Sequence, residues 1–361
     1  MFTTWLAALV LTTASVQESR SDMPQTAAPV QDAPVAAEPA ETPAAPPDMP
    51  AQAAGPQLRF DTAPAEPDIV RTSARDYAAF HHTVADLREA PIGSAEDLDT
   101  AMDRLSVFYG EERLVRAWIA YAAIVAAHHP EYLDEIRELA DYYGPQAAIS
   151  GLMYDPAYAT SFGSAAAAQD SVVDAIERDN EEIREVSQRY RTAAYDLQSE
   201  RWANRVYRDR AERLARIVEV SDDPILMPDE LSMSLDTGLD AGVPASALFE
   251  RLDAVPVESA LGPQLTLTVG EATPDPDRTR IGRILSVAAL QSIDGTMGTD
   301  TDAAIDNLLA DPSVERCLAW VRLDLQQCVA AGHFKYEDSF CIAEHALLDV
   351  SRCLATANPA Q

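Results

Sequence analysis

The sequence predicts an all-α protein: a helical bundle domain with one long helix, followed by a small helical domain that disulfides hold together. Three observations predict this class. Alanine is abundant and aromatic residues make up only 7% of the 361-residue chain, a composition that favours helices over sheets. Apolar residues recur at helical spacing through residues 73–217 and again after Arg280. Four cysteines, an even number, lie at or after residue 317.

The N-terminus is apolar over residues 1–16, MFTTWLAALVLTTASV, and has no charged side chain there. As a helix this segment spans only about 24 Å, less than the roughly 30 Å of a bilayer core. We therefore expect a signal peptide, with a short membrane anchor as the alternative. Residues 17–67 are rich in Pro, Ala and acidic residues, which predicts a disordered linker. If the signal peptide is cleaved, the linker that follows it connects the folded part to nothing. The presence of a linker therefore favours the alternative, in which residues 1–16 are retained as an anchor.

Residues 68–217 are expected to form the first helical domain. Ser94 followed by Asp97 is typical of a capping box, and Pro130 suits a first helical turn. The longest helix is expected over about 164–206, with a bent continuation toward Ile217 as the alternative. Within it, five apolar residues alternate at spacings of three and four, and they are Ile183, Val186, Tyr190, Ala193 and Leu197. Two heptads are too short a seam to indicate a dimer, so we expect these residues to pack against neighbouring helices.

Residues 218–279 are rich in Pro, Asp and Gly and are expected to be a loop-rich connection to a second helical domain at 280–357. A short helix is expected near 245–253. The stretch QLTLTVG at 264–270 alternates like a strand. One strand forms no sheet, so the predicted class stays all-α.

The chain is strongly acidic, with 27 basic and 59 acidic side chains and a formal net charge of −32. This charge excludes ordinary nucleic-acid binding, which requires a basic face. One stretch, residues 201–217, is locally basic. It is either a solvated face that pairs with neighbouring acids or a docking face for an anionic partner. The candidate residues of that face are Arg201, Arg205, Arg208 and Arg213.

Helix geometry predicts how the four cysteines pair. On one helix, Cys317 and Cys328 are about 16 Å apart and Cys341 and Cys353 about 18 Å, whereas bridged Cα atoms lie about 4.4–6.8 Å apart. The bridges must therefore join two helices. Gly332 is expected to end the first helix, and the short connection after it makes the two helices antiparallel. The expected pairs are Cys328–Cys341 near the turn and Cys317–Cys353 at the far end.

The remaining chemistry of the sequence is sparse. Paired cysteines are typical of an oxidising compartment, so we expect an exported protein of the periplasm or cell envelope. No motif for a catalytic serine, a phosphate loop or a dinucleotide occurs, and no His-Glu-x-x-His spacing, so the sequence predicts neither a cofactor nor a metal site. Glu337 and Asp338 fall in the expected hairpin turn, where they are expected to cap the last helix. A carboxylate pair that hydrolyses glycans is the alternative.

One short motif indicates a ligand. Residues 294–305 have the sequence DGTMGTDTDAAI. This stretch resembles the core of the three-helix peptidoglycan-binding domain, and the resemblance extends at most over 281–309. It implies a tight turn, a helix that the threonine opens, and a binding site whose candidate residues are Asp294, Gly295, Gly298 and Thr301. A glycine turn before a capped helix, without a ligand, is the alternative.

Together these features predict a non-catalytic, exported cell-envelope protein that acts as an interaction or structural module. The expected partner is peptidoglycan or an envelope protein, and a membrane only if residues 1–16 are retained. An envelope hydrolase that uses carboxylates of the C-terminal domain is the alternative.

Overall fold

The computed structural model describes seven stretches of the chain, and they are residues 68–110, 112–206, 210–221, 223–225, 229–249, 277–293 and 299–357. All regular secondary structure in these stretches is helical, with one isolated bridge between Val206 and Phe334, so the predicted all-α class is confirmed. None of the helices described here is both long and apolar enough to span a membrane. The expectations for residues 1–67, for the strand at 264–270 and for Arg208 lie outside the described residues.

The first three helices begin where local chemistry places them. α1 (Ile69–Glu89) begins after Asp68, whose carboxylate accepts hydrogen bonds from two backbone amides. α2 (Ala95–Ser106) begins after Ser94, whose hydroxyl accepts from the Asp97 amide at 3.1 Å, as predicted. The short 3₁₀ segment η1 (Val107–Tyr109) leads to α3 (Arg113–Ala127), which packs along α1 and is buried over most of its surface.

Proline and glycine residues set the boundaries of the next two helices. α4 (Pro130–Tyr143) and α5 (Pro145–Tyr154) each begin with a proline, whose missing amide is not needed in a first turn. Gly144 joins them with φ +88°, a conformation that favours glycine. A 3₁₀ segment, η2 (Pro156–Ser161), then precedes the longest helix of the described residues, α6 (Ala165–Asp196).

The end of α6 differs from the expected end at residue 206. α6 passes into a 3₁₀ turn, η3 (Leu197–Ser199), because the side-chain amide of Asn204 donates to the carbonyls of Gln198 and Glu200 at 2.5 and 3.1 Å and holds a compact turn there. Four residues of the predicted apolar seam are buried in the chain's own core, as expected, and they are Ile183, Val186, Tyr190 and Leu197.

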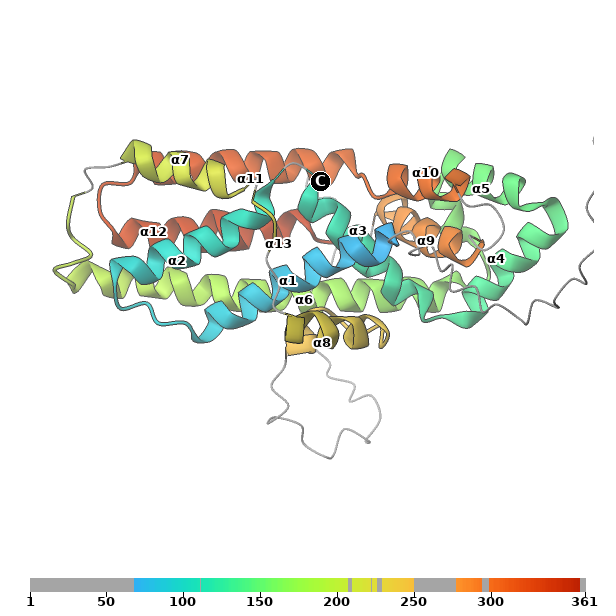
Figure 1. Cartoon of the computed structure of the whole chain (residues 1–361), viewed down its shortest axis with the longest axis horizontal. Coiled ribbons are helices and arrows are strands. Elements are labelled where there is room, and N and C mark those ends of the chain that lie inside the picture. The colour runs from blue at the N-terminus through green and yellow to red at the C-terminus, as the bar shows by residue number, and fades with distance from the viewer. Residues whose placement is uncertain are drawn as a thin grey trace, which may run out of the picture. The chain divides into compact units, whose positions relative to one another are not determined.

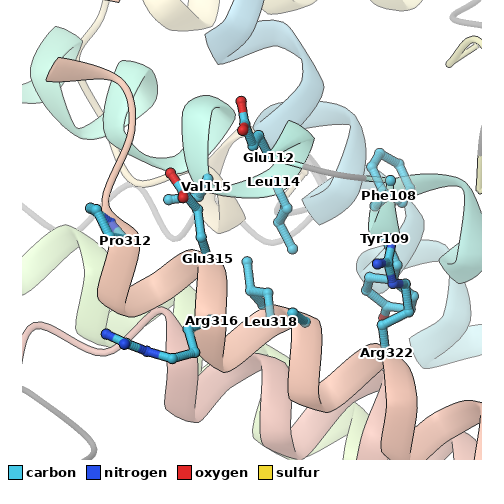
Figure 2. Close-up of a pocket in the computed structure, with 12 residues that line it drawn as sticks. Phe108, Tyr109, Glu112, Leu114, Val115, Pro312, Glu315, Arg316, Leu318 and Arg322 are labelled. Atoms are coloured by element: carbon cyan, nitrogen blue, oxygen red, sulfur yellow. The ribbon is translucent and has the colours of Figure 1, made fainter. Parts of the chain in front are cut away.

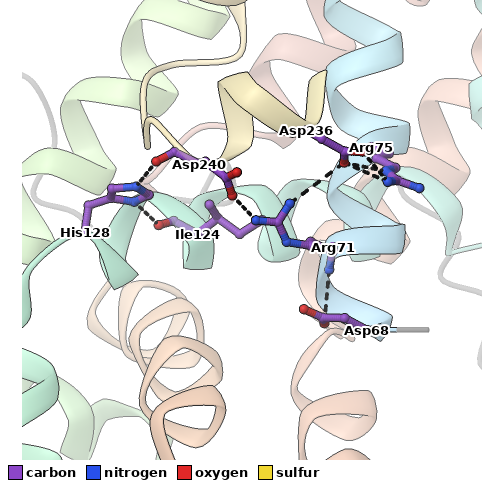
Figure 3. A network of polar contacts seen from close by, with 7 residues as sticks. All are labelled: Asp68, Arg71, Arg75, Ile124, His128, Asp236 and Asp240. Carbon is purple, nitrogen blue, oxygen red and sulfur yellow. Dashed lines mark hydrogen bonds and ion pairs between the residues drawn. The ribbon is translucent and has the colours of Figure 1, made fainter. Parts of the chain in front are cut away.

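Part of the segment expected to be a loop-rich connection is helical. It contains the end of α7 (Arg210–Val220), all of α8 (Asp229–Leu239) and the 3₁₀ segment η4 (Ser246–Phe249), which falls where a short helix was expected. Figure 3 shows how polar contacts attach α8 to α1 and α3: Arg75 Nη2 lies 2.7 Å from both carboxylate oxygens of Asp236, and His128 Nε2 lies 2.9 Å from the Asp240 carbonyl.

The helices after residue 277 share one core with those before residue 218. α9 (Arg278–Ile293) packs against α3, α4 and η2. The next helix, α10 (Thr299–Leu308), packs against α9. All described residues belong to one compact unit, Ala63–Gln361, where the sequence predicts two helical domains. The physical reason is α9, most of whose residues from Arg280 to Ile293 are buried and therefore require cover from the first helices.

The C-terminal hairpin confirms the predicted disulfide pairs. Its first arm is α11 (Pro312–Ala331), and its second arm is a continuous helical run formed by α12 (Tyr336–Cys341), the π-helical segment η7 (Ile342–Leu348) and α13 (Asp349–Cys353). Cys328 is bonded to Cys341 and Cys317 to Cys353, with Cα–Cα distances of 5.8 and 5.6 Å. The second arm packs against both α11 and α6 and lies between them in Figure 1.

Candidate functional site

The predicted arginine face does not form as a unit. Arg213 is only 16% exposed at its side chain and forms an ion pair with the buried carboxylate of Asp338. Arg201 and Arg205 are exposed, whereas Arg208 lies outside the described residues. The alternative, in which basic residues of this stretch pair with neighbouring acids, therefore holds for Arg213.

The carboxylates at the hairpin turn have structural partners. Glu337 accepts hydrogen bonds from the backbone amides of His333 and Phe334, the latter at 3.3 Å, so it closes the turn before α12. Asp338 is 2% exposed and lies 2.8 Å from Lys335 Nζ, in addition to its contact with Arg213. Both side chains are engaged by the fold, and neither lines the pocket described below.

The motif that resembles the peptidoglycan-binding domain is described only in its second half. Thr301 lies in α10, and it is fully buried with its hydroxyl lacking a hydrogen-bond partner. Ala304 and Ile305 on the same helix are also buried. Asp294, Gly295 and Gly298 lie outside the described residues.

A pocket that the sequence does not indicate lies between α11 and the segment that joins η1 to α3. Its volume is about 360 Å³. Six residues of α11 line it, and four of these lie three, four and seven residues apart on one helix face: Glu315, Leu318, Ala319 and Arg322. The facing wall consists of Phe108, Tyr109, Gly110, Glu112, Leu114 and Val115. In Figure 2, Leu114 and Leu318 point toward each other across the pocket. We call this cavity the α3–α11 pocket.

Both walls of the α3–α11 pocket are fixed to the core. The hydroxyl of Tyr109 donates a hydrogen bond to the carbonyl of Ala346 in η7, and burial raises the pKa of that hydroxyl, which keeps it a donor. α11 begins after Asp311, whose carboxylate accepts from the amides of Ser313 and Val314 at 2.9 and 3.2 Å. The two disulfides fix the remainder of α11 to the second arm. The pocket is therefore preformed.

The acidic end of the pocket is electrostatically unfavourable in the free protein. Burial raises the pKa of the Glu315 carboxyl, and the neighbouring carboxylates of Glu112 and Asp311 raise it further. Oxygen Oε1 of Glu315 is buried and has no hydrogen-bond partner. Glu112 has a left-handed backbone with φ 57°, an uncommon conformation for a residue other than glycine. A carboxyl with a raised pKa and a residue with an uncommon backbone conformation are typical of sites that serve binding rather than stability.

The other end of the pocket is basic. Arg322 lies seven residues after Glu315, which places the two about 10 Å apart along the helix axis. In Figure 2, Arg322 lies with Phe108 and Tyr109, at the opposite end of the pocket from Glu315. Among the described residues, Arg322 takes part in no ion pair, and neither does Arg316, which lies on the Glu315 side of the pocket in Figure 2. Along α11 the pocket thus offers the carboxylate of Glu315 for a cation, an apolar middle, and the guanidinium of Arg322 for an anion.

Glu315→Gln is expected to raise the unfolding temperature at pH 7. A carboxyl whose pKa is raised by folding destabilises the folded state when it is ionised, and this penalty disappears as the pH falls below the ordinary value of 4.5. The gain should therefore vanish in acid. Thermal unfolding between pH 4 and pH 8, followed by circular dichroism, measures it. Glu138→Gln, at an exposed position on α4, is the matched control and should change nothing. A lower unfolding temperature for Glu315→Gln at pH 7 would show that this carboxylate stabilises the fold.

Comparison with known proteins adds no assignment. No protein family, no curated protein and no solved structure matches this chain.

Proposed function

We propose that this chain is an exported, non-catalytic interaction module of the cell envelope, and that it binds a peptide of peptidoglycan in the α3–α11 pocket. One observation carries the proposal: a pocket with an apolar middle has at one end the Glu315 carboxylate, whose buried Oε1 has no hydrogen-bond partner, and at the other end the Arg322 guanidinium, which forms no ion pair among the described residues. A short peptide with an amino group and a carboxylate about 10 Å apart complements both ends. The peptides of peptidoglycan carry both groups.

Export is supported by the cysteines. Among the described residues no cysteine is free, because all four form disulfides. Such bonds persist in oxidising compartments and are rare in the cytosol. The apolar segment at residues 1–16 supports the same proposal.

A non-catalytic role is supported by the carboxylates of the hairpin turn. Glu337 accepts hydrogen bonds from backbone amides and Asp338 contacts Lys335 and Arg213, so both carboxylates have structural roles. Peptidoglycan as the partner also agrees with the resemblance of residues 281–309, although the pocket is built from other residues. The alternative partner is an envelope protein, and the experiment below distinguishes it from peptidoglycan.

Co-sedimentation of the oxidised full chain with purified peptidoglycan sacculi tests this function. Glu315→Gln and Arg322→Gln each remove one charge from an end of the pocket, and each is expected to reduce the bound fraction several-fold. Arg205→Gln is the matched control, because Arg205 is exposed and lies outside the pocket. Measurements at low and at high salt separate specific binding from general attraction, since exposed charges are screened by salt.

The outcomes separate the candidate sites. Loss of binding in the pocket variants, with Arg205→Gln unchanged, supports the proposal. Loss only in Gly298→Val would move the site to the motif at 294–305. Absence of sedimentation with the unaltered chain would contradict peptidoglycan as the partner and leave an envelope protein.

One observation favours hydrolysis as a second candidate. The raised pKa of Glu315 beside the carboxylate of Glu112 is the arrangement by which paired carboxyls donate a proton and stabilise a cation. Release of soluble fragments from labelled sacculi measures this activity. Fragments released by the unaltered chain but not by Glu315→Gln would establish the hydrolase and overturn the non-catalytic proposal.

A further inference from the structure

A second group of side chains converges on the hairpin, away from the pocket. Asp324 of α11, His345 of η7 and Asp349 of α13 each place one ligand atom within 4.8 Å of the other two. We call them the Asp–His–Asp cluster. We propose that this cluster binds a divalent transition-metal ion, with Zn²⁺ as the ion that fits best.

The disulfide ladder holds the cluster in place. Asp324 lies on α11 between Cys317 and Cys328, and the other two ligands lie on the second arm between their bonded partners. His345 and Asp349 are four residues apart and share one face of the second arm, with Nδ1 and Oδ2 separated by 2.9 Å. A covalent bridge on each side of the cluster fixes the separation of the arms, so an ion meets ligands that are already assembled.

The kinds of ligand select the kind of ion. One imidazole and two carboxylates form a set typical of Zn²⁺ and related ions, whereas Ca²⁺ and Mg²⁺ prefer oxygen ligands alone. Three protein ligands leave further coordination positions for water. The thiols play no part, because all four cysteines are in disulfides.

The surroundings orient the carboxylate without occupying the site. Asp349 Oδ1 lies 2.7 Å from Arg352 Nη1, whereas Oδ2 faces His345. An ion between His345 Nδ1 and Asp349 Oδ2 takes the place of the hydrogen that these atoms share, and Arg352 continues to orient the carboxylate, as outer partners of metal ligands do. Among the described residues, Asp324 has no ion-pair partner that would compete for its carboxylate. The strong negative charge of the chain favours any cation.

Calorimetric titration of the oxidised full chain with Zn²⁺ tests the proposal, with Ca²⁺ and Mg²⁺ titrated in parallel. We expect one Zn²⁺ per chain and at least about tenfold weaker binding in Asp324→Asn and in His345→Gln. His333→Gln and Asp302→Asn are matched controls, because both replace exposed side chains outside the cluster. Both controls should bind like the unaltered chain.

A spectroscopic measurement keeps the test independent of folding. Co²⁺ absorbs visible light according to its ligands, so replacing the imidazole should change the spectrum in His345→Gln while far-ultraviolet circular dichroism shows the same helix content. Equal Zn²⁺ affinity in the cluster variants and the controls would overturn the proposal. Absence of Zn²⁺ binding to the unaltered chain would overturn it as well.

Discussion

Asp338→Asn is expected to lower the free energy of unfolding by about 3 kcal/mol, at the lower end of the range for breaking a buried ion pair. Asp338 is 2% exposed and contacts two cations, Arg213 Nη2 and Lys335 Nζ. Removing its charge leaves these cations in poorly hydrated positions, with side chains only 16% and 4% exposed. Lys335 retains a contact with the more exposed Asp99, which limits the loss.

Urea denaturation of the oxidised protein measures this change. Asp103→Asn is the matched control: its carboxylate pairs with Arg216, whose side chain is 64% exposed, so the expected loss is below about 1 kcal/mol. The double variant Arg213→Gln, Asp338→Asn should lose less than the sum of the two single variants, because each single change leaves a buried partner unpaired. Equal losses for Asp338→Asn and Asp103→Asn would contradict the buried network.

Local chemistry made much of the helical fold predictable. The hydroxyl of Ser94 and the ring of Pro130 each act within a few residues, and the structure begins helices where these residues predict. The disulfide pairs were predictable for a similar reason, since helix rise and a short turn restrict which cysteines meet. The pairing of Cys328 with Cys341 inside the pair Cys317–Cys353 follows from the hairpin alone and does not depend on the rest of the chain.

Packing between distant segments was not predictable in the same way. The composition of residues 218–249 is typical of loops, yet Leu235 and Leu239 of α8 are buried, and Asp236 beside them binds Arg75 of α1. The sequence of neither segment indicates which other segment it contacts. The same limit applies to α9, whose apolar surface requires cover but does not identify which helices provide it.

The α3–α11 pocket was missed for this reason. The spacing of Glu315, Leu318 and Arg322 places them on one face of a helix. An apolar residue such as Leu318 on that face predicts packing in the core, not the wall of a pocket. The facing wall, which includes Tyr109 and Leu114, lies about 200 residues earlier in the chain. No periodicity connects the two segments.

The Asp–His–Asp cluster, by contrast, had a usable signal. Asp324 lies four residues before Cys328, and His345 lies four residues after Cys341. In an antiparallel hairpin joined at Cys328 and Cys341, these positions must face each other. A search confined to spacings within one helix finds His345 and Asp349 but not the third ligand on the other arm.

Gly282→Ala is expected to destabilise the protein by about 3 kcal/mol, at the upper end of the usual range for overpacking. A Cβ atom at Gly282 in α9 would lie 2.2 Å from the carbonyl oxygen of Pro156 and 2.8 Å from Cα of Ala157. These are backbone atoms of η2, so no side chain can rotate away, and α9 must separate from η2. The helix preference of alanine, worth about 1 kcal/mol, is too small to offset this.

The same substitution at Gly151 in α5 should have the opposite sign. There the nearest atom to a new Cβ is a ring carbon of Tyr158 at 3.9 Å, an ordinary contact, so only the helix preference of alanine remains and the variant should gain up to about 1 kcal/mol. Urea denaturation of both variants therefore gives a difference of about 4 kcal/mol between two chemically identical changes. A gain of stability in Gly282→Ala would contradict the close packing of α9 on η2, which is one of the contacts that bring α9 into the same core as the first helices.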